Sequence, residues 1–264
     1  MTPEGARNDA EAGLLQPGSQ QQTADEIIYR LSHDLRGSTR ALSDLPTWIQ
    51  EDLAEAGLEL PDSVQDCLHL MQNHTQRLNK MIDGLLLHSR VGRSPAEVMD
   101  GGQAVRKVLT RRTLPDTARL RSKLQEGAVQ ISMPDLEMAV DVLISNALIH
   151  GSPDTRIAIT GSIEQDSPET GLGDFWVLKV RDNGPGIPER HWTEVFKPMV
   201  SLHAASDDKG VGMGLAILDK IALHCGGRAW VARPSRDRQG ASLCLALPLS
   251  DETQMQSPSR VRAH

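Results

Sequence analysis

Two runs of apolar residues, spaced alternately by three and four positions, constrain the fold of this 264-residue chain more than any other feature. They occupy residues 28–49 and 64–85, and each has the heptad spacing of a helix that packs against other helices. Between them, Gly57 suits a helix end and Asp62 or Ser63 suits a helix start. The two helices are therefore expected to form an antiparallel hairpin. The seam residues are Ile28, Leu31, Leu35, Ser38, Leu42, Leu45 and Ile49 in the first helix, and Val64, Leu68, Met71, Thr75, Leu78, Ile82 and Leu85 in the second.

A two-helix hairpin has a poor core when it stands alone. The simplest partner for its apolar seams is a second copy of the same hairpin, which predicts a homodimer with a four-helix bundle. Pro46 interrupts the first seam and is expected to kink or relax that helix.

Beyond the hairpin, helical and strand patterns are mixed, which predicts a sheet covered by helices, of the α+β or mixed α/β kind. Helices are expected over Gln103–Arg112, Pro134–His150 and Leu215–Cys225. Alternating apolar residues predict strands at 157–163, in "DFWVLKVRD" and in "ASLCLALPL". The predicted divisions are a flexible tail at 1–22, the hairpin at 23–92, a linker at 93–98, a second domain at 99–249 and a flexible tail at 250–264.

Composition excludes several other classes of protein. The formal net charge of −7 and the pI near 5.7 argue against a general nucleic-acid binder, which carries a basic face. No apolar run approaches the roughly 20 residues of a membrane span, and the N-terminus lacks the basic and apolar segments of a secretory signal. The three cysteines fit neither a disulfide framework nor a zinc site, so a cytoplasmic protein is expected.

The stretch "YRLSHDLRGSTRAL" places His33 on the first helix, opposite the apolar seam, so its ring should face solvent. Asp34 follows it, and a carboxylate beside an imidazole can hydrogen-bond one ring nitrogen and leave the other as a nucleophile. An ordinary surface histidine fits the same local pattern. Gly37 and Ser38 are unusual residues for the middle of a helix.

The stretch "VRDNGPGIP" follows a predicted strand, and Asp182 ends that strand. A buried aspartate here can accept a hydrogen bond from an exocyclic amine such as that of adenine. Gly184 and Gly186 let the backbone bend and approach a flat ligand closely. An ordinary Asn-Gly-Pro-Gly turn is the alternative interpretation.

The stretch "KGVGMGLAI" alternates Gly210, Gly212 and Gly214 just before a predicted apolar helix. Glycines at this spacing allow backbone N–H groups and a helix N-terminus to face phosphate oxygens. A flexible loop without a ligand is the alternative.

The stretch "DVLISNALIHG" places Asn146 and His150 four residues apart, on one face of a helix. The amide oxygen of Asn146 is a suitable ligand for Mg²⁺, a hard ion that binds carbonyl oxygens. A polar helix face with a capping histidine is the alternative.

These stretches, taken together and in this order, resemble the sensor histidine kinases of two-component signalling. "SHDLRGSTRAL" resembles the H box, "LISNALIHG" the N box, "DNGPGI" the first glycine box, "VFKP" the F box and "GVGMGLAI" the second glycine box. The resemblance covers the chain from about Ala24 to Leu249. It implies a HisKA-type dimerisation and phosphotransfer hairpin followed by an α/β sandwich of the GHKL ATPase type.

The resemblance implies a soluble kinase that uses ATP and Mg²⁺ to phosphorylate its own histidine and passes the phosphoryl group to an aspartate of a response regulator. His33 would be the phosphoacceptor and Asp34 the adjacent acid. Input would come from a separate sensor protein, and regulator specificity would lie on the hairpin surface below His33. Asn146 would ligate Mg²⁺, and the nucleotide-binding residues would be Asn146, His150, Asp182, Gly184, Gly186, Phe196, Lys209, Gly210, Gly212 and Gly214.

Several positions depart from the family's pattern. Ser38 replaces the usual proline, and Gly37 stands where many relatives carry a Thr or Asn that places a hydrolytic water. In the N box, Val142 and Ile149 replace an asparagine and a lysine. Phosphate contacts would then fall to Lys197, His203 or Lys209.

These departures keep alternatives open. One is a histidine phosphotransferase whose catalytic domain no longer binds ATP. Others are a GHKL ATPase without kinase activity, and an interaction scaffold that uses only the hairpin.

Overall fold

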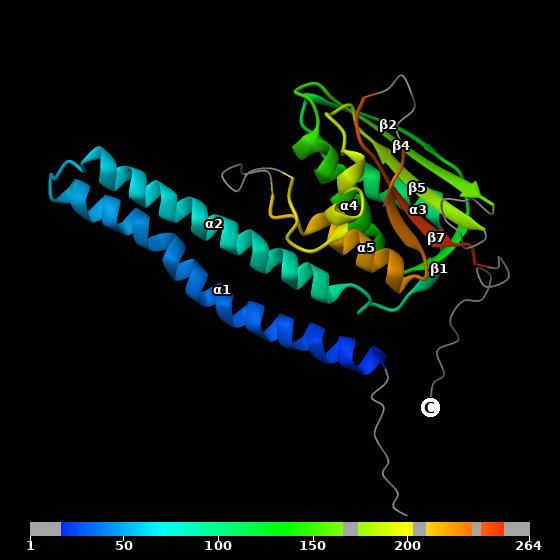
Figure 1. Cartoon of the computed structure of the whole chain (residues 1–264), viewed down its shortest axis with the longest axis horizontal. Coiled ribbons are helices and arrows are strands. Elements are labelled where there is room, and N and C mark those ends of the chain that lie inside the picture. Colours follow the sequence, from blue (N-terminus) through cyan, green and yellow to red (C-terminus); the bar gives the residue numbers. More distant parts are fainter. Residues whose placement is uncertain (1–16, 166–173, 203–209, 234–238, 251–264) are drawn as a thin grey trace, which may run out of the picture.

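The computed structural model describes residues 17–165, 174–202, 210–233 and 239–250. It divides into a long helical hairpin and an α/β domain that lies against one end of it (Figure 1). Helix α1 spans Pro17–Glu55 and helix α2 spans Asp62–Arg90. This arrangement confirms the predicted fold class. None of the helices in the described ranges has the length and apolar character needed to cross a bilayer.

Helix α1 begins earlier than the sequence pattern predicts. Its first residue is Pro17, so the predicted tail at 1–22 is wrong for residues 17–22. Proline is tolerated in the first turn of a helix, and the Gln20–Gln22 run that follows is a good helix former. The remainder of both predicted tails, 1–16 and 251–264, lies outside the described residues.

Helix α1 continues through Pro46 without a break, and its axis changes direction in the middle of the helix (Figure 1). Along the sequence, Gly37 and Ser38 lie near the middle of the helix and Pro46 lies in its last third, and such residues are the usual causes of helix bends. The predicted kink is therefore a bend within one continuous helix.

Helix α1 contacts α2 through small and polar side chains. Ser32 and Thr39 are almost fully buried, one heptad apart. Asn79 on α2 donates a hydrogen bond to Ser43 Oγ across the hairpin at 3.1 Å. Arg36 on α1 also hydrogen-bonds the carboxylate of Asp83 on α2.

The apolar seam of α1 does not face α2. Leu31 is 57% exposed and Leu35 is 50% exposed, and on α2 Met71 is 43% exposed. Leu68 and Ile82, in contrast, are buried against α1. The single chain therefore leaves a long apolar stripe on the hairpin uncovered, which includes Leu31, Leu35, Leu42, Leu45, Ile49, Met71 and Leu78.

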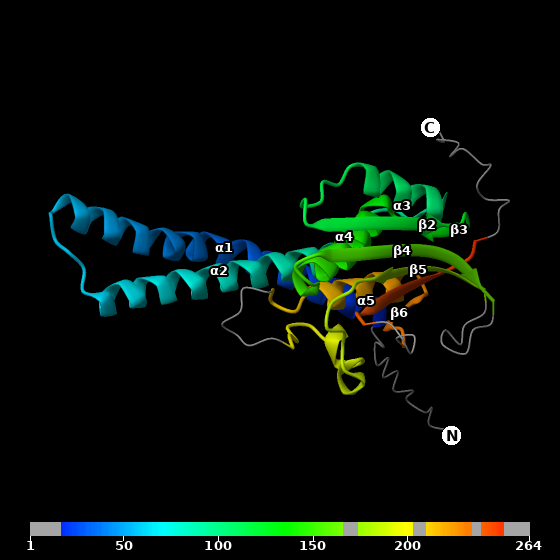
Figure 2. The same ribbon diagram turned by 90° about the horizontal axis from the view of Figure 1, so that it is seen from above.

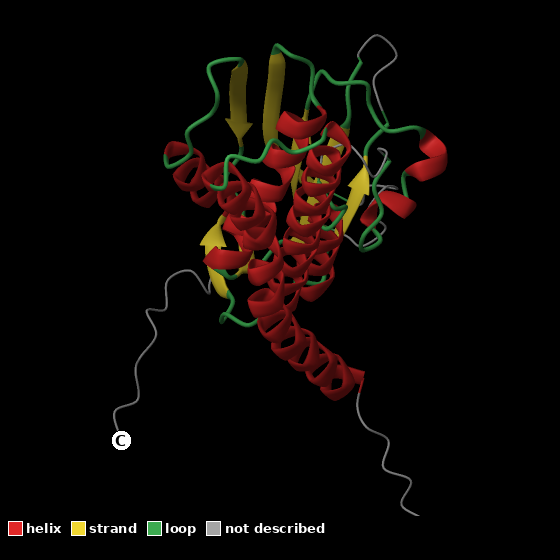
Figure 3. Cartoon of the chain, turned by 90° about the vertical axis from the view of Figure 1, so that its left-hand side faces the viewer, coloured by secondary structure: helices red, strands yellow, loops and turns green. Residues whose placement is uncertain are grey.

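The α/β domain has one layer of helices against a five-stranded sheet (Figure 3). The strand order is β2-β4-β5-β7-β6, with β2 and β6 at the edges (Figure 2). Strands β2 and β4 are parallel and the other neighbours are antiparallel. The strands are β1 (Glu97–Asp100), β2 (Ala118–Leu124), β3 (Ala128–Ile131), β4 (Thr155–Glu164), β5 (Phe175–Arg181), β6 (Arg228–Val231) and β7 (Ser242–Pro248), and the other helices are α3 (Gly101–Thr110), α4 (Met133–His150) and α5 (Gly214–His224).

The main core lies between the sheet and helices α3, α4 and α5. On β7, Leu243, Leu245 and Leu247 point into this core, as the alternation predicts. Strands β1 and β3 form a separate two-stranded sheet. Because β1 begins at Glu97, the structure places the start of a strand inside the predicted linker at 93–98.

The α/β domain rests on the C-terminal half of α2, where α5 runs beside it (Figure 1). Lys220 on α5 donates a hydrogen bond to the backbone oxygen of His88 at 3.0 Å. Met213 packs against Gly84, where an added Cβ would lie 2.6 Å from the Cγ atom of Met213. Glycine in the interior of a helix costs about 1 kcal/mol relative to alanine, and here its small size permits the close approach of the two domains.

Candidate functional site

His33 lies on the solvent-exposed surface of α1, as its helical position predicts. Its side chain is 75% exposed, and that of Asp34 is 82% exposed. His33 Nδ1 lies 3.4 Å from Asp34 Oδ1, so this carboxylate is positioned to accept a hydrogen bond from the Nδ1–H group of the tautomer protonated there. The tautomer with the proton on Nδ1 leaves the lone pair on Nε2, the nitrogen farther from Asp34.

A cavity of about 1090 Å³ opens between α4, the glycine-containing loops and α2. Its lining includes most of the predicted nucleotide-binding residues, which are far apart in the sequence. Those that the structure brings together are Asn146, His150, Asp182, Gly186, Gly210, Gly212 and Gly214.

Asp182 is buried at one end of this cavity. Its Oδ1 accepts hydrogen bonds from the backbone N–H groups of Gly184 at 2.7 Å and Ala241 at 3.0 Å. Burial raises the pKa of the Asp182 carboxyl, and these backbone hydrogen bonds oppose the rise. Neither hydrogen bond uses Oδ2, so this oxygen can accept a hydrogen bond from a ligand in the cavity.

Two glycines around the cavity cannot carry a side chain without displacing backbone. A Cβ at Gly184 would lie 2.4 Å from the backbone oxygen of His150, because the loop after β5 crosses the end of α4. Gly212 has a φ of 72°, and a Cβ there would lie 2.3 Å from the oxygen of Val200. Gly184 thus shapes the loop that carries Asp182 and does not itself line the cavity.

Asn146 lines the cavity from α4. Its amide can present an oxygen there, and such an oxygen suits a hard divalent cation that is also bound by phosphate oxygens. Within the described ranges, no group of three or more His, Cys, Asp and Glu side chains could hold a metal ion. The amide oxygen of Asn146 therefore fits a cation that also takes phosphate oxygens of a nucleotide as ligands.

Val142 and Ile149 also line the cavity, and Ile149 is 44% exposed. The resemblance to histidine kinases predicts polar side chains at these two positions of α4, but here the side chains are apolar. Arg112 binds the nearby polar groups of α4, through an ion pair with Asp141 and a hydrogen bond of 3.2 Å to Ser145 Oγ.

Phe196 does not line this cavity, so the structure does not bring it together with the other predicted nucleotide-binding residues. It lies in the short 3-10 turn η2 (Glu194–Phe196), where successive side chains point in different directions. Val195 faces the cavity instead, and Phe196 lines a separate hollow beside β6. Lys197 is exposed outside the cavity lining, and the predictions for His203 and Lys209 lie outside the described residues.

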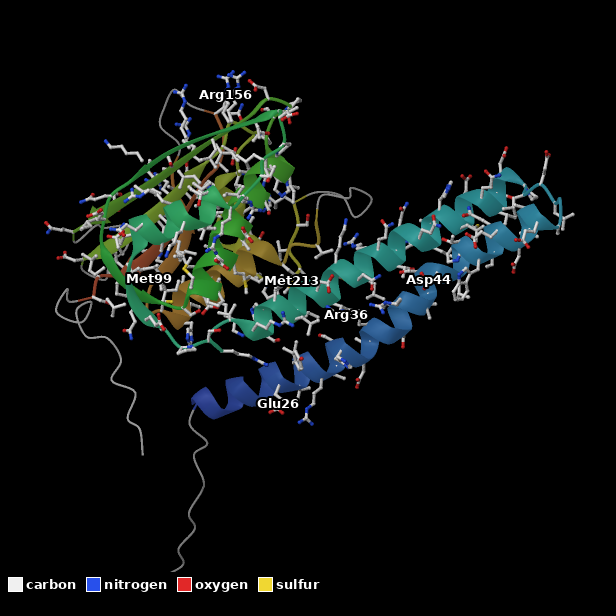
Figure 4. All side chains as sticks on the ribbon, turned by 180° about the vertical axis from the view of Figure 1, so that it is seen from behind. Glu26, Arg36, Asp44, Met99, Arg156 and Met213 are labelled. Carbon is white, nitrogen blue, oxygen red and sulfur yellow. The ribbon has the colours of Figure 1, made fainter. Side chains whose placement is uncertain are left out.

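Helix α2 forms one wall of the cavity, which the sequence motifs do not predict. Lys80, Asp83, Gly84 and Leu87 all line it. Figure 4 labels Met213 where the α/β domain meets α2, and Arg36, the partner of Asp83, between the helices of the hairpin. Gly84, a helix-interior glycine, is the one local signal in the sequence for this contact.

Several known proteins resemble this chain in sequence and in fold. Residues 132–251 match the family of histidine kinase-, DNA gyrase B- and HSP90-like ATPases. The chain is 25% identical over 260 residues to the phytochrome-like protein Cph1 of Synechocystis sp., and this covers 93% of the chain and 32% of the relative. It is 27% identical to the methanogenesis regulatory histidine kinase FilI of Methanothrix harundinacea, covering 85% of the chain and 24% of that relative. The chain thus spans about a quarter to a third of the length of these curated relatives.

Solved structures show the same fold. Full-length ShkA in complex with AMPPNP superposes with a TM-score of 0.56 at 16% identity, over 86% of this chain and 46% of that one. The histidine kinase AdeS of Acinetobacter baumannii superposes with a TM-score of 0.52 at 19% identity, over 83% of this chain and 98% of that one. Residues 132–251 therefore match the description of the histidine kinase-, DNA gyrase B- and HSP90-like ATPases, and the chain as a whole is similar to relatives that include a named histidine kinase.

Proposed function

We propose that this chain is an ATP-dependent protein-histidine kinase that phosphorylates His33 and passes the phosphoryl group to an aspartate of a response regulator. One observation carries the proposal. The same chain combines an exposed His-Asp pair on α1 with an ATPase-family cavity, one wall of which is α2, the partner helix of α1.

In the proposed reaction, Nε2 of His33 attacks the γ-phosphorus of ATP. The new N–P bond forms as the bond between the γ-phosphorus and the bridging oxygen breaks, and ADP leaves with that electron pair. Asp34 holds the ring by its contact with Nδ1 and stabilises the positive charge that develops on the imidazole. The phosphohistidine then transfers its phosphoryl group to the carboxylate of a receiver domain.

In the cavity, Oδ2 of Asp182 would accept a hydrogen bond from the amino group of adenine. The backbone N–H groups near Gly210, Gly212 and Gly214, at the start of α5, would face the phosphates. Asn146 would help to hold Mg²⁺, which neutralises phosphate charge when bound. Residues 91–96, between α2 and β1, would permit the domain movement that brings the γ-phosphate to His33.

Incubation with γ-labelled ATP and Mg²⁺ tests this proposal. A kinase should acquire a label that is stable in base and labile in acid. A chain that gains label only from a phosphorylated regulator would be a phosphotransferase, which the apolar Val142 and Ile149 in the cavity wall keep as the second candidate. ATP hydrolysis without any labelled histidine would indicate an ATPase of the same fold.

A homodimer is predicted from the uncovered apolar stripe of the hairpin. Light scattering after size exclusion should give twice the 28.8 kDa mass of the chain. Replacing Leu35 and Leu42 together by Asp should yield a monomer, because each buried leucine contributes about 1.5–3 kcal/mol and a buried charge opposes packing. Leu223→Asp, on α5 and 65% exposed, is the matched control and should leave the mass unchanged. A monomeric wild type at micromolar concentration would contradict the bundle.

Gly37 offers a test of whether the chain can dephosphorylate its regulator. A Cβ at this position would meet no atom within 4 Å, so a larger side chain fits. Gly37→Ala should raise the free energy of unfolding by about 1 kcal/mol through helix propensity alone. Gly37→Asn adds an amide one turn from His33 and should speed the loss of phosphate from a phosphorylated regulator relative to Gly37→Ala. Equal rates for the two variants would refute this role for the position.

Nucleotide affinity should fall on acidification at a higher pH than for an ordinary aspartate. Burial raises the pKa of Asp182 above the ordinary value of 3.8, and protonation removes the charged acceptor. The same raised pKa favours the folded state at low pH, so Asp182 itself does not cause unfolding as it becomes protonated. Titration of nucleotide binding against pH, with circular dichroism at each point, checks both statements. Affinity that stays constant down to pH values near 3.8 would contradict the role of Asp182.

A further inference from the structure

Strand β6 (Arg228–Val231) is at an edge of the main sheet and, among the strands of the described residues, pairs only with β7. The backbone N–H of Ala232 donates to the oxygen of Ser242, the residue opposite it, at 2.8 Å. In an antiparallel pair, hydrogen-bonded and non-hydrogen-bonded residues alternate along each strand, so this bond fixes which residues of β6 bond to β7. With this register, Trp230 directs its backbone groups toward β7. Ala229 and Val231 therefore direct theirs outward, where an additional strand would pair.

A groove of about 460 Å³ runs along this edge, and it shares no lining residue with the nucleotide cavity. Ala229 and Val231 form its floor from β6. Trp192 and Phe196 supply aromatic surface from the loop before α5. The groove thus places outward backbone groups beside apolar side chains, which is the arrangement that receives an extended peptide.

The charge of the groove favours an acidic peptide. Arg228 is exposed and lies over the ring of Trp230, with 5.6 Å from its guanidinium carbon to the ring centroid. Arg233 pairs with Glu189 at 3.2 Å, but both side chains are at least 70% exposed. Exposed pairs of this kind are worth at most about 1 kcal/mol, so an incoming carboxylate can compete with Glu189. Asp219 is the one acidic residue among the residues that line the groove, against the two arginines Arg228 and Arg233.

We propose that the groove beside β6 binds an extended segment of a partner protein, which adds as a strand along Ala229 and Val231 and places an acidic side chain against Arg228 or Arg233. The aromatic pair Trp192 and Phe196 would receive its apolar side chains. The proposal does not depend on kinase activity, because the groove is separate from both His33 and the nucleotide cavity.

Hydrogen exchange on the full chain tests this proposal. The probe is a capped peptide of about eight alternating Val and Glu residues, a typical strand length. Its addition should slow exchange of the Ala229 and Val231 amides and leave the amides of the hairpin unchanged. A peptide with Lys in place of Glu should bind about tenfold more weakly, a difference of roughly 1.4 kcal/mol. A peptide N-methylated on its pairing amides should not bind.

Two variants separate strand addition from non-specific attraction. Val231→Pro removes an outward N–H, which edge strands tolerate, together with part of a side chain that is buried in the main core, and it should abolish the protection at Ala229. Arg228→Glu together with Arg233→Glu should reverse the preference between the Glu and Lys peptides. Nucleotide binding serves as the check of folding for both. Absence of binding by the wild type, or equal binding of the N-methylated peptide, would overturn the proposal. The arginines would then serve only to prevent edge-to-edge aggregation of the sheet.

Discussion

His33→Ala should abolish the acid-labile label from γ-labelled ATP while leaving nucleotide affinity within about twofold of the wild-type value, as expected for a distant site. The side chain is exposed on α1 and does not line the nucleotide cavity, so its removal disturbs neither the fold nor the binding of ATP. Without the imidazole, in contrast, the γ-phosphoryl group of ATP has no acceptor. Label on the protein measured after gel electrophoresis, with nucleotide affinity measured by calorimetry, gives both readouts.

Two further variants make this prediction specific. His69→Ala removes another exposed histidine of the hairpin and should keep full labelling. Asp34→Asn keeps the size of the side chain that lies 3.4 Å from His33 Nδ1 but loses its charge. It should slow phosphorylation by roughly 10²-fold, the lower end of the range for a group that assists proton transfer. Label that persists in His33→Ala would place the phosphoacceptor elsewhere.

The sequence predicted the elements whose periodicity is strong and local. Helix α4, strand β4 and strand β7 all have clear apolar patterns, and the structure confirms them. Strand β2 was missed because its exposed positions carry Arg119, Arg121 and Lys123 and only part of one face is apolar. The short strands β1, β3 and β6 contain too few residues for a period to emerge.

For the site, the motifs predicted most of the residues that line the cavity, but they did not predict that helix α2 forms one of its walls. Asp182 and Asn146 come together because each is anchored in a strand end or helix that the pattern identifies. The wall formed by α2 depends on how two domains dock, which no local pattern encodes. The position of Phe196 outside the cavity was unforeseen for a related reason, since the orientation of a side chain in a single 3-10 turn depends on its neighbours in space.

Asp182→Asn should weaken ATP binding by roughly 100-fold while the chain stays folded. The asparagine keeps an oxygen that can accept the backbone hydrogen bonds of Gly184 and Ala241, so the loop is retained. Its second atom becomes an NH₂ donor, which would face the amino group of adenine and leave two buried donors without an acceptor. Such a mismatch costs about 1–3 kcal/mol, and the upper part of that range corresponds to about 100-fold in affinity.

Asp219→Asn is the matched control for this variant. Burial raises the pKa of the Asp219 carboxyl as it does that of Asp182, but Asp219 lies outside the nucleotide cavity. Asp219→Asn should leave ATP affinity unchanged, whereas Asp182→Asn should weaken ATP binding roughly 100-fold and lower the labelling of His33 at limiting ATP. Comparing ATP with GTP sharpens the test, because guanine presents an oxygen where adenine presents its amino group, and an Asn NH₂ can donate to it. Asp182→Asn should therefore narrow the preference for ATP over GTP; an unchanged preference would show that Asp182 does not contact the base.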